Sequence, residues 1–170
     1  MYLTQMPVIE GDDYQQHQAV RGVFPGDQKV LFQRSDSGLT VLSSEKPVGL
    51  QSQEVDISSQ AVVGKQYSFT IRLNPVKRNI KTHKRVALDN DSVKPWINQQ
   101  LNKAGVEAKF QYVKEGIRRS VKQGKTISLV SVICFGFLTV KNVEDFRRAL
   151  EGGLGHGKGL GFGLLNVFSN

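Results

Sequence analysis

Apolar and polar residues alternate along several short stretches of the chain, and this pattern predicts β-strands. The predicted strands cover residues 1–9, 29–34, 39–43, 66–73, 85–88, 109–114, 127–140 and 160–168. The turn residues Ser35-Asp36-Ser37-Gly38 separate the second strand from the third and predict a hairpin. Residues 46–64 are polar and weakly patterned, so we expect a loop there with one irregular helical turn.

Helical spacing marks three further segments. In the first, Asp13 is a suitable N-cap, Gln16 three positions on completes a capping-box pair, and Gly22 marks the end. The others cover residues 92–103 and 143–152. The face of the first helix expected to pack on a sheet carries Ala19, Val20 and Val23.

The order of these elements predicts an α+β protein made of two tandem ferredoxin-like (RRM-like) domains. The strand, helix and strand pattern of the first half is repeated in the second, although the residues themselves are not. We expect an N-terminal domain over residues 1–76, a basic linker over 77–84 and a C-terminal domain over 85–170 that contains a glycine-rich loop.

Basic residues are concentrated in the middle of the chain. The net charge is +8, and residues 65–125 hold fifteen Lys or Arg against four Asp or Glu. Such a distribution favours a polyanionic partner, most often nucleic acid, although a solvated basic surface would look the same.

Several classes of protein are disfavoured by composition. The single cysteine, Cys134, lies in an apolar run and is expected to be a buried free thiol, which excludes a disulfide framework and a cysteine zinc site. No apolar run approaches the length of a membrane span, and the first residues lack the order of a secretory signal. We therefore expect a cytoplasmic protein without a membrane partner.

The first helix carries the clearest candidate chemistry. Tyr14, His17 and Arg21 fall on the side opposite its apolar face. An imidazole can transfer protons near neutral pH, a phenol can orient a substrate, and a guanidinium can hold an oxyanion, so the trio suits phosphate chemistry. A polar trio without a catalytic role is also common on surface helices.

Glycine occupies every second position from Gly153 to Gly163. A Walker A loop would need Ser or Thr after Lys158, where Gly159 stands, and a dinucleotide-binding loop would lead from a strand into a helix. What remains is a loop whose bare backbone can approach another backbone, in the protein or in RNA, with Lys158 available for a phosphate.

Two basic segments suit the phosphate backbone of a structured RNA. The linker segment carries Lys77, Arg78, Lys81, Lys84 and Arg85, and a second cluster around Gly124, at an expected hairpin tip, carries Arg118, Arg119, Lys122 and Lys125. His83 and His156 are read as phosphate-contacting or surface histidines. The three histidines have no metal-ligand spacing and no acidic cluster suits two-metal chemistry, so we expect neither a metal nor a cofactor.

Four motifs together resemble a known family. They occur in the order Met1-Tyr2-Leu3-Thr4, Tyr14-Gln-Gln-His17, Arg72-Leu-Asn-Pro-Val-Lys-Arg78 with Lys84-Arg85, and the glycine loop Gly153–Leu165. In this combination and order the chain is similar to the CasE-type CRISPR repeat-cleaving enzymes of the RAMP superfamily. The resemblance spans nearly the whole chain, except residues 34–66.

The resemblance implies tandem ferredoxin-like domains that bind a CRISPR repeat hairpin and cut at its 3′ base. The 2′-hydroxyl upstream of the scissile phosphate would attack, leaving a 2′,3′-cyclic phosphate or its opened form. His17 would transfer protons as acid or base, Tyr14 would position or stabilise, and the basic residues above would hold the hairpin. The enzyme would then stay on the crRNA with other subunits of a CRISPR interference complex.

Two other interpretations remain open. The same fold could hold a hairpin without cutting it. An unrelated RNA-binding ferredoxin-like protein, for instance a ribosome-associated one, would show exposed aromatic residues on its sheet strands for base stacking, a role that Tyr67 and Phe69 could fill.

Overall fold

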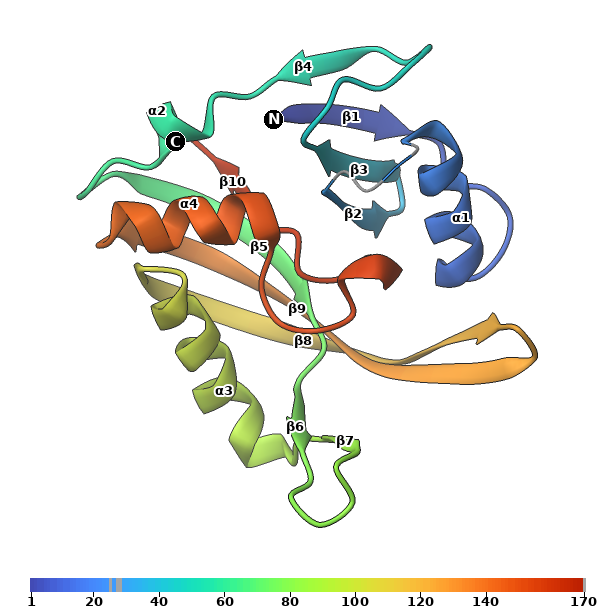
Figure 1. Ribbon diagram of the computed structural model, residues 1–170. Coiled ribbons are helices and arrows are strands. Elements are labelled where there is room, and N and C mark those ends of the chain that lie inside the picture. Colours follow the sequence, from blue (N-terminus) through green and yellow to red (C-terminus); the bar gives the residue numbers. More distant parts are fainter. Residues whose placement is uncertain (25, 27–28, 170) are drawn as a thin grey trace.

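Two four-stranded antiparallel sheets and one small two-stranded sheet form the protein (Figure 1). The structure is a computed structural model that describes residues 1–24, 26 and 29–169. Helices cover one face of each large sheet, and a long hairpin of the second sheet reaches across to the first helix (Figure 1).

The first sheet has the strand order β2-β3-β1-β4. Its elements are β1 (Tyr2–Met6), α1 (Asp13–Val23), β2 (Val30–Ser35), β3 (Gly38–Ser43) and β4 (Ser52–Glu54). The predicted hairpin is confirmed, since Ser35 pairs with Gly38 at its turn. One face of the sheet packs against α1 through a cluster of Val20, Phe24, Phe32, Leu39 and Val41.

The second sheet has the order β10-β5-β9-β8, which is the arrangement of a ferredoxin-like βαββαβ fold. Its elements are β5 (Gln66–Leu73), α3 (Asn90–Lys103), β8 (Val106–Lys122), β9 (Lys125–Val140), α4 (Val143–Gly152) and β10 (Asn166–Phe168). The helix-facing side forms the larger core, in which Cys134 is buried as a free thiol, as predicted. Burial raises the pKa of this thiol to about 12.

The short elements complete the chain. They are α2 (Ile57–Gln60), β6 (Val76–Arg78), β7 (Arg85–Ala87) and the 3-10 helix η1 (Lys158–Leu160). The predicted α+β fold with two antiparallel sheets is therefore present. None of the helices in the described part of the chain is long and apolar enough to cross a membrane.

The order of the predicted strands made residues 85–88 the first strand of the second sheet. The structure does not place them in that sheet. Their first three residues form β7, which pairs with β6 in the small sheet and is exposed, while Leu88 is partly buried against the core. β5 takes the position instead, with Tyr67, Phe69, Ile71 and Leu73 all buried. The sheet pairing thus joins β5 to the second half, whereas the boundary predicted at residue 76 placed it in the first.

The cap of α1 lies one residue earlier than predicted. Asp12 accepts hydrogen bonds from the amides of Tyr14 and Gln15, and the side-chain oxygen of Gln15 accepts a bond from the amide of Asp12. Gln16 is instead fully buried, and its amide group bonds both backbone groups of Ile9. The buried face of the helix carries Asp13 and Gln16 beside the predicted Val20, with Ala19 and Val23 only partly buried.

In the hairpin of β8 and β9, β8 is far longer than the strand predicted at 109–114, whereas β9 nearly matches the strand predicted at 127–140. The pairing of β5 with β9 ends where Leu73 lies opposite Val132. Residues 116–131 of the β8–β9 hairpin therefore extend beyond the four-stranded sheet, and we call them the arm. A bulge between Lys114 and Gly116 marks the start of the arm. Its tip is a two-residue turn in which Gln123 and Gly124 both have positive φ, as type I′ hairpin turns require.

The glycine-rich loop packs on the protein's own backbone. The strand predicted at 160–168 is reduced to β10, and η1 with extended chain replaces the rest. The carbonyl of Gly163 accepts a bond from the Leu154 amide, and the Gly163 amide donates to the Arg72 carbonyl. A Cβ at Gly163 would lie 2.4 Å from the Leu154 carbonyl oxygen, so only glycine permits this approach.

Candidate active site

The start of α1 is fixed to the arm by two acidic residues. The carboxylate of Asp12 that caps the helix also accepts a 2.8 Å bond from the amide of Val121. Burial by itself raises the pKa of Asp12, but the hydrogen bonds from Val121, Gln15 and Tyr14 outweigh it and lower the pKa. One carboxylate thus joins the helix of the first sheet to the hairpin of the second.

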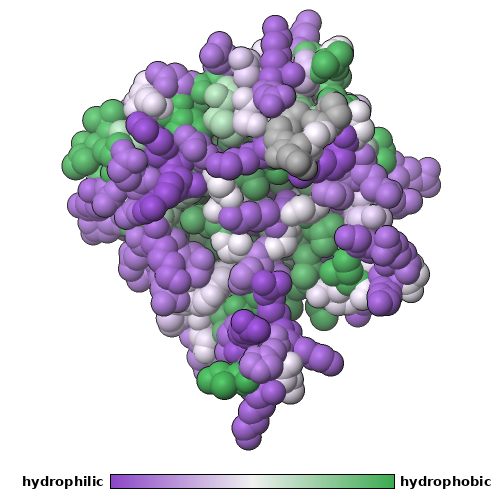
Figure 2. All heavy atoms as spheres, viewed as in Figure 1, coloured by the Kyte–Doolittle hydropathy of each residue, from purple (hydrophilic) through white to green (hydrophobic). Residues whose placement is uncertain are grey.

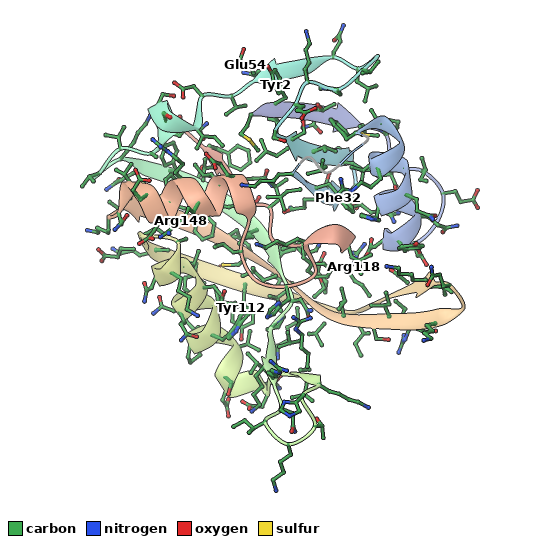
Figure 3. The ribbon with its side chains drawn as sticks, viewed as in Figure 1. Tyr2, Phe32, Glu54, Tyr112, Arg118 and Arg148 are labelled. Atoms are coloured by element: carbon green, nitrogen blue, oxygen red, sulfur yellow. The ribbon has the colours of Figure 1, made fainter. Side chains whose placement is uncertain are left out.

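The neighbouring Asp13 forms a bidentate ion pair with Arg118. Both N···O distances are 2.6 Å, and the Asp13 side chain is only 6% exposed. The bond from Asp13 raises the pKa of Arg118 further, so the guanidinium stays charged. Figure 3 shows Arg118 on the arm, next to the first helix.

This docking brings the predicted catalytic residues together. The rings of Tyr14 and His17 stack with their centroids 6.1 Å apart. The ammonium group of Lys122, on the arm, lies 5.8 Å from the centre of the Tyr14 ring. A Cβ at Gly159, in the glycine-rich loop, would lie 3.7 Å from the imidazole, so the loop backbone faces His17 directly.

His17 lies in a cleft of about 400 Å³ between the first helix and the glycine-rich loop. Cations surround the cleft, since Arg21, Lys29 and Lys158 also line it, and Glu151 is the one acidic residue among its lining residues. The Lys158 ammonium donates to the Gly152 carbonyl at 2.6 Å. Burial lowers the pKa of Lys158. The arrangement suits a phosphate beside an imidazole.

The pKa of His17 is lowered from its usual value of 6.5. Burial is the largest cause, and the charges of Arg21 and Lys122 act in the same direction. A histidine with a lowered pKa is neutral at pH 7, so its imidazole can accept a proton.

We expect the pKa of His17 to rise when Lys122 is replaced by Gln, because one of the cations that disfavour the imidazolium is removed. Titration of the His17 ring signals by NMR would measure the change. Lys125→Gln, which removes an exposed charge from the arm tip, should leave the midpoint of the His17 titration unchanged. An unchanged midpoint in Lys122→Gln would show that Lys122 does not act on the imidazole.

The other predicted RNA-binding residues divide into two groups. Arg119 and Lys125 are exposed on the arm together with Lys122. The second group lies on the β6–β7 hairpin, away from His17, and all its members are exposed: Lys77, Arg78, Lys81, Lys84 and Arg85. This hairpin projects at the bottom of Figure 1, and Figure 2 shows hydrophilic residues over most of the same face.

Sequence reasoning missed three contributors to the site. Asp13 was considered only as a helix cap, and neither Asp12 nor Lys29 was considered for the site. The ion pair from Asp13 to Arg118 joins residues 105 positions apart, so no local pattern could reveal it. Arg118 was predicted to bind RNA, yet two of its nitrogens are bonded to Asp13.

Tyr67 and Phe69 cannot stack on bases, as one alternative proposed, because each is only 1% exposed in the core. The exposed aromatic residues of the second sheet are Phe135, Phe137 and Phe168 instead. Among the described residues, no three His, Cys, Asp or Glu side chains come together in a group that could hold a metal ion.

Comparison with known proteins identifies relatives of this chain. A family model described as CRISPR associated protein matches residues 5–168. The CRISPR-associated endoribonuclease Cse3 of Thermus thermophilus is 31% identical over 119 residues, which cover 61% of this chain. The matched region spans 56% of that relative's length.

Solved structures share the whole fold. A CRISPR endoribonuclease Cse3 bound to 19 nt RNA superposes with a TM-score of 0.85 at 22% identity, over 99% of this chain and all of that one. A chain of a CRISPR RNA-guided surveillance complex gives a TM-score of 0.80 at 18% identity, over the full length of both. The family match over nearly the whole chain, with this shared two-domain fold, shows that the chain belongs to the CRISPR-associated protein family.

Proposed function

We propose that this protein is a metal-independent endoribonuclease that binds the hairpin of a CRISPR repeat and cleaves precursor CRISPR RNA at the 3′ base of the hairpin. The observation that carries the proposal is the cleft in which His17, stacked on Tyr14, faces the backbone of Gly159 among cations. Support also comes from the relative named an endoribonuclease.

In the proposed reaction the 2′-oxygen upstream of the scissile phosphate attacks phosphorus, and the bond to the 5′-oxygen breaks. Neutral His17 can take the proton of the 2′-hydroxyl, or its protonated form can supply one to the leaving 5′-oxygen. Tyr14 positions the imidazole through the stacked ring contact. Arg21, Lys29 and Lys158 stabilise the charge that develops on the phosphate oxygens. The products are a 2′,3′-cyclic phosphate and a 5′-hydroxyl.

The arm and the β6–β7 hairpin hold the RNA in this proposal. Both present exposed cations, and a structured RNA is recognised largely through its phosphate backbone. The ion pair of Arg118 with Asp13 fixes the arm to α1, so RNA bound along the arm leads directly to His17. Arg118 acts here mainly through Asp13, which its Nε and Nη2 bind, and its Nη1 is the nitrogen that would contact a phosphate.

We expect the triple variant Arg119→Ala, Lys122→Ala, Lys125→Ala to bind the repeat hairpin more weakly. Affinity for hairpins of other sequences should fall by a similar factor, because phosphate contacts do not depend on the base sequence. Each lost phosphate contact should reduce the slope of log K against log salt by about 1. Binding titrations at several salt concentrations measure this slope. Lys94, exposed on α3, provides a control in Lys94→Ala. An unchanged slope in the triple variant would remove the arm from the RNA interface.

The proposal includes stable association after cleavage. One similar structure is described as bound to RNA and another as a surveillance complex. We propose that this protein likewise stays on the crRNA as a subunit of a CRISPR interference complex.

The direct test is incubation of the protein with the repeat RNA of its neighbouring CRISPR array in excess EDTA. A single cut with a 2′,3′-cyclic end supports the proposal. An RNA with a 2′-deoxy nucleotide upstream of the cut should bind but remain intact, since the nucleophile is missing. Tight binding without cleavage of the unmodified RNA would indicate a non-cleaving subunit that binds the hairpin, and no preference for the repeat would overturn the proposal.

A further inference from the structure

A second cleft lies on the other side of the glycine-rich loop from His17. It has a volume of about 310 Å³ and is bordered by the end of β5, the β6–β7 hairpin, the arm and the loop. Gly157 and Leu160 line this cleft, whereas Lys158 and Gly159 line the His17 cleft. The same turn of the loop therefore borders both clefts.

A buried amide marks the floor of this second cleft. Asn74 follows β5, is only 2% exposed and lines the cleft. Its Oδ1 is buried and has no hydrogen-bond partner among the described residues. A buried acceptor is stable when a donor reaches it, so the site favours a ligand with an N–H group.

The walls match a planar heterocycle with a phosphate attached. Val76, Leu129 and Leu160 supply apolar surface. Arg85, also in the lining, supplies a cation, and His156 supplies an imidazole. Burial lowers the pKa of His156, and the neighbouring charge of Arg85 lowers it further. Unpaired bases are bound in this way, held between apolar side chains and read along one edge by hydrogen bonds.

We propose that this cleft binds one unpaired nucleobase of the substrate RNA, next to the cleaved phosphate, and that the Asn74 amide reads its edge. An asparagine amide pairs best with an edge that offers a donor beside an acceptor, as adenine does. Arg85 holds the phosphate of that nucleotide. The inference rests on the proposed function for its ligand, because the loop that forms this cleft also faces His17.

The test measures binding of a non-cleavable repeat RNA, with a 2′-deoxy nucleotide upstream of the cut. Abasic nucleotides are placed in turn at each unpaired position beside the hairpin. We expect one position to weaken binding by about tenfold in the unaltered protein, the loss of one well-paired base contact. If no unpaired position matters, the proposal is overturned.

Protein variants then assign that position to the cleft. Asn74→Leu should weaken binding of the full RNA by about the same factor, and the abasic change should cause no further loss, because both remove one contact. Ser128→Phe, at an exposed arm position, should fill the cleft and act in the same way without disturbing the core. Asn102→Leu, at an exposed position of α3, is the matched control.

If the abasic change weakens binding further in both Asn74→Leu and Ser128→Phe, the two losses are additive and the base lies outside this cleft. The proposed function is judged separately, by cleavage of the unmodified repeat and its loss in His17→Ala. Cleavage with no effect of the cleft variants would overturn this inference and leave the nuclease assignment intact.

Discussion

Replacing His17 with Ala should abolish cleavage of the repeat hairpin while leaving its binding nearly unchanged. Proton transfer by a positioned side chain contributes about 10²–10⁴-fold to rate, so we expect a loss in this range. His17 lines a cleft among cations that remain in the variant, and these retain the RNA. Single-turnover cleavage and equilibrium binding, measured on the same RNA, separate the two effects.

Gln18→Ala provides the matched control for this variant. Gln18 is the next residue of α1, but it is exposed and does not line the cleft. Its replacement should change neither cleavage nor binding. A His17→Ala protein that cuts at the rate of the unaltered enzyme would remove the imidazole from the mechanism. Loss of binding together with cleavage would instead point to a role in holding the RNA.

The grouping of Tyr14 and His17 on one side of α1 was predictable because helical spacing is local. Tyr14 and His17 lie three positions apart, so any helix here places both on one side, and the stacked rings confirm it. The cap was not predictable, since Asp12 and Asp13 are each followed by glutamine three residues later. Only the arm, 105 positions away, decides between them by binding Arg118 to Asp13.

The second sheet shows the same limit at a larger scale. Residues 66–73 were predicted as a strand, with bounds identical to those of β5, because Tyr67, Phe69 and Ile71 alternate with polar residues. The partner of a strand is not encoded in that alternation. β5 pairs with β9, about 65 positions later, and this pairing moves it from the predicted first domain into the second sheet.

Arg72 shows how the two sheets are held together. It was noted in the sequence only as part of a motif, but its side chain is 6% exposed and each of its three nitrogens donates a hydrogen bond. Two of its nitrogens bond the carboxylate of Glu115, at the bulge of β8, and the third bonds the carbonyl of Arg34 in β2 at 2.7 Å. Ser131 donates to the same carboxylate. One guanidinium therefore connects both sheets at the base of the arm.

The pH behaviour of this network follows from Glu115. Burial raises its pKa, but the bonds from Arg72 and Ser131 and the charges of Arg72 and Arg118 outweigh burial, and the pKa falls below its usual value of 4.5. A carboxylate with a lowered pKa in the folded state stabilises the protein above the unfolded pKa. That contribution should be lost as the pH falls from 4.5 through the lowered value.

We expect Arg72→Met to reduce the free energy of unfolding at pH 7 by about 3 kcal/mol, since removal of one partner leaves a poorly compensated carboxylate and an unpaired carbonyl. Urea unfolding measures the loss. Adding Glu115→Gln should recover part of it, because the uncompensated charge is then gone. A double variant no more stable than Arg72→Met would show that the bond to Arg34 is the main contribution.

Because the network lies where the arm leaves the sheet, Arg72→Met should also slow cleavage in a protein that is still folded. The reason would be weaker docking of the arm on α1.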